Sequence, residues 1–213
     1  VIPLSQYETT KTDVGAISIK KWRKAASAEA IHKSGANGAI RDTDAKLLKD
    51  VQADVRRDMF TFINGTITGA DTATGANLQS ALANAWGKLQ IKFENDAVEP
   101  VYFINPLDAA EYLGTATITT QNAFGLNYIE DFLGLGTVII TSQITQGTFV
   151  ATAKENFVME YINMNGDVAN AFGLTTDETG FIGINSGIID NDRAQIESLV
   201  MSGIKILVEY AAG

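Results

Sequence analysis

The sequence predicts an α+β protein in which one mixed module interrupts another. Three observations support this class: a long one-sided helix over residues 42–64, a helix–strand–helix succession between residues 77 and 114, and a closing run of strands from about 180 to 210. Helices and strands that alternate closely indicate packed α/β layers. Because an early helix and late strands then frame the middle of the chain, residues 75–182 are expected to be an insert.

The helix predicted over residues 42–64 is the element around which the rest is organised. At 1.5 Å per residue it would run roughly 30 Å, about the width of a domain. Asp42 or Thr43 is expected to cap its start, and Asn64 with Gly65 to end it. Apolar residues recur every three or four positions and form one stripe, which other parts of the chain should cover. The stripe consists of Leu48, Val51, Val55, Met59 and Phe62, widened by Leu47 and Ile63.

The residues before this helix indicate an extended, basic arm. Residues 1–24 carry five Lys or Arg against Glu8 and Asp13, a net charge of +3. Ile17 and Ile19 alternate with polar or small neighbours, as in a strand with one apolar face. The segment is compatible with an ordinary edge hairpin kept soluble by lysines, or with an arm that contacts another molecule. Residues 25–41 are expected to form a short helix followed by a Gly/Asn break.

Between residues 77 and 162 the pattern predicts an α/β layered module. A helix over 77–95 is followed by a buried strand at 98–105, and Asn105-Pro106 marks the start of another short helix. Later strands are expected at 136–142 and 147–153, and residues 154–162 should begin as a turn and end as a strand. The closing strands are predicted at 180–190, 194–203 and 204–210, separated by the turn at Asn191-Asp192 and by Gly203.

Composition excludes several kinds of site. The 213 residues include no Cys, which rules out disulfides and thiolate chemistry, and His32 alone cannot build a site with several histidines. No apolar run approaches the ~20 residues that span a bilayer, and no signal-peptide pattern opens the chain. We therefore predict no cofactor, no metal and no membrane. The chain begins with Val1 rather than methionine, which we interpret as a cut made before this residue.

Charge is distributed unevenly along the chain. Residues 1–92 contain 13 Lys and Arg against 9 Asp and Glu, a net of +4, whereas residues 93–213 contain 3 against 16, a net of −13. One interpretation is a solvated acidic surface. The other is self-association, in which a basic arm of one copy meets the acidic body of the next. The acidic part disfavours tight nucleic-acid binding, since that requires cations at the phosphates.

Catalytic motifs are scarce. Gly134 and Gly136 resemble a dinucleotide fingerprint, but they precede a predicted strand, and the fingerprint requires glycines after one. Two acidic pairs lie in turn sequences, Asp177 with Glu178 and Asp190 with Asp192; such pairs usually cap turns or remain hydrated. We predict no catalytic residue, and a chain of this size without chemistry is typically structural or binding.

The order of parts resembles the major capsid protein of tailed bacteriophages, whose fold is shared with encapsulin shells. A basic extended arm, a long helix, an α/β insert and a closing sheet follow one another as in that family. Several stretches look like capsid proteins of siphophages and prophages of Gram-positive bacteria. They are KKWRKAASAEAI, NLQSALANAWGKLQIKFEND, VYFINPLDAAEYLG, ITTQNAFGLNYIEDFLGLGTVIITSQITQGTFVATAKENFVMEYI and LTTDETGFIGI.

This resemblance implies a domain plan. Residues 1–28 would be part of the E-loop, residues 29–74 and 183–213 the peripheral (P) domain with its spine helix, and residues 75–182 the axial (A) domain. Family members usually carry an N-terminal arm and a first E-loop strand before this point.

The resemblance also implies a function. The chain would be a non-enzymatic structural protein that self-assembles into pentamers and hexamers of an icosahedral phage shell enclosing double-stranded DNA. It would be made in the bacterial cytoplasm and located in the virion capsid. Its partners would be its own copies, together with scaffold, portal or decoration proteins, and packaged DNA only non-specifically. It would need no cofactor.

The arm carries the residues that we expect to contact an adjacent copy. Our hypothesis is that its basic face meets acidic groups there and that an aromatic side chain anchors the contact. Two other functions stay open: an encapsulin-type nanocompartment shell, which needs a cargo-docking surface, and a small α/β enzyme with a pocket around Asp177 and Glu178. The expected assembly contacts are Lys20, Lys21, Trp22, Arg23 and Lys24.

Overall fold

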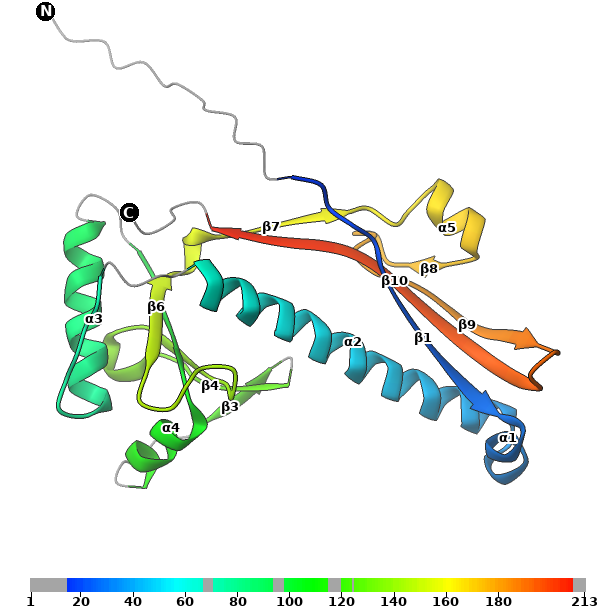
Figure 1. Ribbon diagram of the computed structural model, residues 1–213, viewed down its shortest axis with the longest axis horizontal. Helices are drawn as coiled ribbons and strands as arrows, with labels where there is room; N and C mark the ends of the chain where they lie inside the picture. Colours follow the sequence, from blue (N-terminus) through cyan, green and yellow to red (C-terminus); the bar gives the residue numbers. More distant parts are fainter. Residues whose placement is uncertain (1–14, 67–70, 94–97, 115–119, 124, 209–213) are drawn as a thin grey trace, which may run out of the picture.

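Two β-sheets joined by one long helix make up the computed structural model (Figure 1). It describes residues 15–66, 71–93, 98–114, 120–123 and 125–208. The first sheet has the strand order β1-β10-β9-β8, with β7 also paired to β10, and the second has the order β3-β4-β5-β2-β6. The mixed α+β class predicted from the sequence is confirmed.

The long helix is α2, Ala36–Thr66, which runs beneath the first sheet and ends beside the second (Figure 1). The predicted start at Asp42 or Thr43 is wrong, because helical hydrogen bonding is in place several residues earlier. The N–H of Ala39 already donates to the carbonyl of Gly35 at 3.0 Å, and Ala39 is buried. Only Gly35, with a φ of 71°, separates α2 from the predicted short helix, α1 (Ala28–Ser34).

The apolar surface of α2 is divided between the two sheets. Leu47 and Val51 pack under the first sheet, whereas Phe60 and Ile63, further along the helix, pack against the second. Because the contacts lie on two sides of the helix, the single predicted stripe is only partly right. It included Leu48, which is 40% exposed, and omitted Phe60, which is 1% exposed.

Strand β10 (Gln195–Val208) is the centre of the first sheet. It pairs antiparallel with β1 (Lys20–Ser27), with β9 (Gly183–Asp190) and with β7 (Phe157–Ile162), and β8 (Thr175–Thr176) pairs with β9. The predicted break at Gly203 is wrong, since β10 continues through it. Packing is close there: a Cβ on Gly203 would lie 3.0 Å from Cδ1 of Ile162.

The second sheet is built around β2 (Pro100–Ile104), whose residues are all buried. The side chain of Asn105 accepts the N–H of Leu107 at 2.9 Å, so the predicted cap is confirmed. The predicted helix 77–95 is α3, capped by Asn77 and Ser80. The other elements of this layer are α3 (Leu78–Lys92), α4 (Pro106–Leu113), β3 (Gln121–Ala123), β4 (Leu126–Ile129), β5 (Thr137–Ile140), β6 (Phe149–Ala153) and the short 3-10 helix η1 (Phe132–Gly134).

The chain passes from the second sheet to the first through the 3-10 helix η2 (Lys154–Asn156). The turn-then-strand pattern predicted for residues 154–162 is confirmed by η2 and β7. Strand β7 and, further on, α5 (Asp167–Phe172) pack with the first sheet. The domain limits 29–74, 75–182 and 183–213 stay a prediction, and the change of sheet occurs at residues 154–156.

Candidate assembly surface

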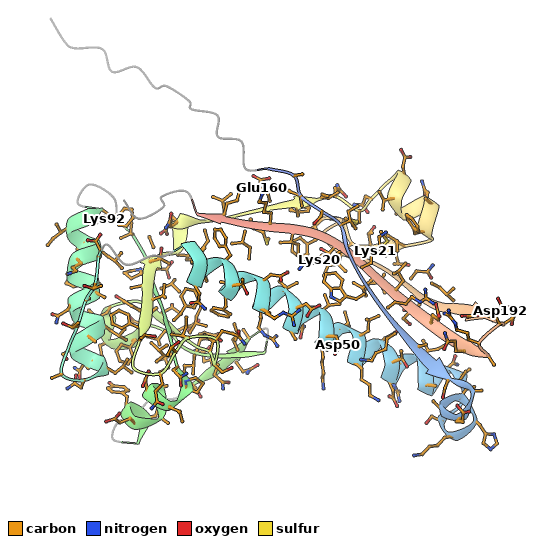
Figure 2. All side chains as sticks on the ribbon, viewed as in Figure 1. Lys20, Lys21, Asp50, Lys92, Glu160 and Asp192 are labelled. Carbon is orange, nitrogen blue, oxygen red and sulfur yellow. The ribbon has the colours of Figure 1, made fainter. Side chains whose placement is uncertain are left out.

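The arm strand β1 lies against both α2 and the edge of β10 (Figure 2). Alternate side chains of a strand point to opposite faces, so every second residue of β1 faces the helix. Three of these residues each contact one aspartate of a single row on α2. The pairs are Lys20 with Asp58, Trp22 with Asp54, and Lys24 with Asp50.

The regular pairing follows from matched repeats. Two residues of a strand advance about 6.6 Å, and four residues of a helix advance about 6.0 Å. Asp50, Asp54 and Asp58 are spaced by four, and because the strand runs antiparallel to the helix each step meets the next side chain of β1. We call these three pairs the arm ladder.

Trp22 forms the half-buried step of the arm ladder. Its indole Nε1–H donates to Oδ2 of Asp54 at 2.7 Å, and its ring packs with Leu47, Val51 and Val200. The guanidinium of Arg57 donates to Oδ1 of Asp54 at 2.5 Å. The hydrogen bond from Trp22 is the largest cause that lowers the pKa of Asp54; Arg57 and Lys20 lower it further, and desolvation opposes them.

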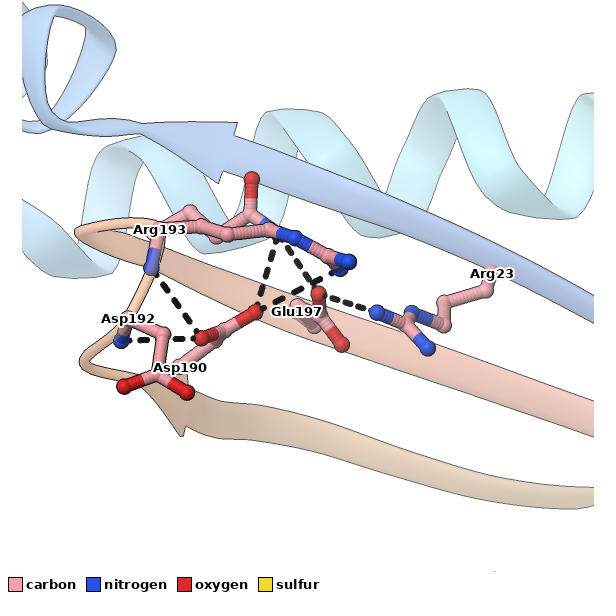
Figure 3. Close-up of polar contacts among 6 residues, drawn as sticks. Arg23, Asp190, Asp192, Arg193 and Glu197 are labelled. Atoms are coloured by element: carbon pink, nitrogen blue, oxygen red, sulfur yellow. Dashed lines mark hydrogen bonds and ion pairs between the residues drawn. The ribbon is translucent and has the colours of Figure 1, made fainter.

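The opposite face of β1 is tied to β10 through a buried carboxylate. Arg23 donates to Oε1 of Glu197 at 2.6 Å, and Nε2 of Gln195 donates to the same oxygen at 2.6 Å (Figure 3). Glu197 is 6% exposed, and a carboxylate buried to this extent requires such donors. The arm is therefore held on both of its faces.

The structure gives four of the five expected assembly residues a partner in the same chain: Lys20, Trp22, Arg23 and Lys24. The side chain of Lys21 is exposed and forms no ion pair or hydrogen bond with any residue that the structure describes. Sequence reasoning missed the intrachain partners, although aspartates spaced by four on the predicted helix were a usable signal. Contact of these residues with another copy stays a prediction.

Beside Lys20, at the N-terminal end of β1, a groove opens between α2 and β10. It encloses about 220 Å³ and is bordered by the ion pair of Lys20 and Asp58. Its lining is predominantly apolar, and no strand covers it in the described part of the chain. The apolar lining residues are Trp22, Val55, Phe62, Ile204 and Ile206.

One carboxylate of each acidic pair, Asp177 or Asp190, caps a turn. Oδ1 of Asp177 accepts the N–H groups of Thr179 and Gly180, each at 3.0 Å, and the bond from the Thr179 hydroxyl is the largest cause that lowers its pKa. Oδ1 of Asp190 likewise accepts the N–H groups of Asp192 and Arg193 (Figure 3). These carboxylates are thus occupied by local structure.

Other features give no sign of chemistry among the described residues. His32 is exposed on α1, and Gly134 and Gly136 precede β5, an order that does not fit a dinucleotide-binding turn. In the ranges that the structure describes, no three His, Cys, Asp or Glu side chains gather as metal ligands. Within the same ranges, no helix is both long and apolar enough to cross a membrane.

Comparison with known proteins identifies the fold. No family model matches the chain, and no curated protein matches it. The chain is similar to one of the solved structures, a virus-like particle from Pyrococcus furiosus, with a TM-score of 0.52 and 14% sequence identity. The match covers 92% of this chain and 74% of that chain. At this identity the likeness concerns the fold alone, and the chain has a capsid-like α+β fold.

Proposed function

We propose that this protein is a structural subunit that assembles with its own copies into a closed shell. The finer proposal is the major capsid subunit of a tailed bacteriophage, forming pentamers and hexamers of an icosahedral shell around double-stranded DNA. The observation that carries the proposal is the likeness to a virus-like particle over 92% of the chain. A shell subunit must close by head-to-tail contacts between different surfaces.

Exposed apolar side chains support association. Met159 and Tyr161 are alternate residues of β7, so they project from one face of the strand, and they are 52% and 41% exposed. Opposite them in β10 lie Ile206 and Ile204, two of the residues that line the groove. Adjacent exposed apolar residues typically mark protein contacts, whereas isolated ones need no explanation.

The arm supports the proposal through its rigid attachment. Because the arm ladder and the Arg23–Glu197 pair hold β1 in one position, residues 20–27 would lose little conformational freedom when another copy binds them. In this arrangement Lys21, which has no partner among the described residues, is the basic residue that we assign to the neighbouring copy. The acidic part of the chain, residues 93–213 with a net charge of −13, offers complementary groups.

A bacterial nanocompartment shell of the encapsulin type is the second candidate, because it shares the same fold. Its particles would hold an enzyme cargo instead of DNA, so the contents distinguish the two. An enzyme with a site at Asp177 and Glu178 is disfavoured, since Oδ1 of Asp177 is used in a turn cap.

Electron microscopy of the purified product of the complete gene tests the proposal. We expect uniform hollow polyhedral particles in negative stain, and nucleic-acid and proteomic analysis of their contents would separate phage capsid from nanocompartment. Co-expression with neighbouring genes controls for a need for scaffold. If the protein stays monomeric in both experiments at high concentration, the shell function is wrong.

A further inference from the structure

Strand β10 extends beyond the position where β1 begins. Lys20, the first residue of β1, pairs with Ser202, and β10 continues from Gly203 to Val208 without a partner from β1. Strand β7 pairs with this part of β10 along the edge that β9 occupies further back in β10. The ring centroids of Tyr161, in β7, and Phe181, just before β9, lie 5.4 Å apart, which places both strands on that edge. In the described part of the chain, the edge of β10 on the side of β1 therefore has no strand from Gly203 to Val208 (Figure 1).

The segment that precedes β1 leaves the sheet instead of covering this edge. Residues 15–19 cross over β10 and β7 (Figure 1), and Ile19 packs with Met201, Met164 and Leu174 on the face opposite α2. An uncovered strand edge exposes main-chain N–H and C=O groups that another strand can bind. Here the uncovered edge borders the apolar groove of about 220 Å³.

The existing register shows what residues 15–19 would meet if β1 continued straight. Lys20 lies opposite Ser202 in the antiparallel register of β1 and β10. If this register continued, Ser18 would lie opposite Ile204 and Ala16 opposite Ile206. Both isoleucines line the groove. Ile19 would lie opposite Gly203, on the same face of the sheet that it occupies now.

The spacing of the arm ladder also places Ser18 at the groove in this in-line arrangement. Each step of two residues along β1 corresponds to four along α2, and four residues beyond Asp58 lies Phe62, which lines the groove. Ser18 would therefore face the ring of Phe62. A small side chain beside a large one is the arrangement that lets a strand pack closely on a helix.

We propose that the arm has a second docked state, in which residues 15–19 extend β1 in line along β10 and cover the groove. Lys20 is the pivot, and the arm ladder from Lys20 to Lys24 is the same in both states. The in-line state adds main-chain hydrogen bonds along the edge of β10 beside the groove, and the crossed state keeps the apolar contacts of Ile19. Since the states differ only in this short segment, a partner that favours one direction would shift the population.

The use of these states rests on the proposed function. In one state residues 15–19 run across the sheet, and in the other they run along the axis of α2. Copies at non-equivalent positions of a shell need contacts in different directions, and an arm with two docked directions supplies them without any change in the body of the protein.

Disulfide trapping tests the in-line state directly, because the chain contains no cysteine. Ser18→Cys with Ile204→Cys would be directly opposite only in that state, at about 4.5–5.5 Å between Cα atoms, within reach of a disulfide. The control is Ser27→Cys with Gln195→Cys, which are paired in the observed register. If the first pair does not fold, Ala16→Cys with Ile206→Cys tests the same register.

We expect the Ser18–Ile204 pair to close within the protein under mild oxidation, seen as a gel shift and the loss of two hydrogens by mass. Val55→Phe, which fills the groove, should slow closure several-fold. Complete oxidation of the control with no closure of either test pair would overturn the proposal. A wild-type protein that forms no shells would contradict the proposed function, whereas the trapping result would stand independently.

Discussion

The indole N–H of Trp22 donates to Asp54 at 2.7 Å and thereby joins the arm to the long helix. Asp54 is placed between Asp50 and Asp58, each paired to a lysine of β1, so the bond is the middle step of a regular ladder. Exposed ion pairs contribute little to stability on their own. Trp22, half-buried with Leu47 and Val200, is therefore the step that fixes the arm.

Replacing Trp22 tests this attachment. Trp22→Phe keeps an aromatic ring in the cluster but removes the donor, and we expect a loss of about 1 kcal/mol in the free energy of unfolding. Trp22→Ala should cost more, because it also leaves a cavity. Urea unfolding of the monomer gives both values, and Leu48→Ala on the exposed side of α2 is the control. An unchanged Trp22→Phe protein would show that the hydrogen bond is not stabilising.

Acid should weaken the arm attachment. The folded pKa of Asp54 lies below its ordinary value, chiefly because Trp22 donates to it. A depressed folded pKa contributes stability above the unfolded pKa, and that stability is lost as the pH falls through the folded pKa. The protection of the β1 amides against hydrogen exchange, taken relative to the intrinsic rate at each pH, should therefore fall below about pH 4, the ordinary range of an aspartate.

Asp54→Asn supplies the comparison for this pH dependence. It should abolish the part of the acid effect on β1 that Asp54 causes, while Asp42→Asn, which pairs with Arg41 on another side of α2, should leave it unchanged. Equal acid sensitivity in wild type and Asp54→Asn would assign the effect to other carboxylates.

The sequence predicted those elements whose signals are local. Asn105-Pro106 places a cap and a first helical residue side by side, and the buried run that precedes them could only be a central strand, so β2 and α4 appeared where expected. The start of α2 was missed because Asp42 and Thr43 have strong capping preferences, yet tertiary packing of Ala39 extends the helix past them. At the start of α2, the local capping preference is therefore weaker than tertiary packing.

The partners of the arm could not be predicted in the same way. The spacing of Asp50, Asp54 and Asp58 is visible in the sequence, but nothing local says which strand will lie along that row of the helix. That choice is made by β10, which receives β1 on one edge and so positions Lys20, Trp22 and Lys24 above the aspartates. The basic arm therefore looked available for another copy, although most of its charges are neutralised within the chain.

Arg23 should matter more than its exposure implies. Arg23→Ala would leave buried Glu197 with Gln195 as its remaining donor in Figure 3, and we expect a loss of about 1–2 kcal/mol, less than for a fully buried pair because half of the Arg23 side chain is in solvent. Adding Glu197→Gln should restore part of this loss, since the charge that needs a partner is gone. The two single variants and the double variant form a thermodynamic cycle, measured by urea unfolding. Strict additivity of the two single effects would exclude coupling between the residues.

Lys21 separates the stability of the arm from its use in assembly. Its side chain is exposed and has no partner among the described residues, so Lys21→Glu should leave urea unfolding of the monomer nearly unchanged. If it meets acidic groups of a neighbouring copy, reversing its charge should raise the protein concentration needed for shell formation about five-fold or more, which corresponds to about 1 kcal/mol per contact. Lys49→Glu, an equal charge change at an exposed position of α2 outside the row of Asp50, Asp54 and Asp58, is the matched control.

Light scattering at low salt measures the threshold concentration for shell formation, and the difference between the two variants should shrink as salt screens the contact. Identical thresholds for Lys21→Glu and wild type would remove Lys21 from the interface, and the neighbouring copy would then have to bind the arm through main-chain or apolar contacts.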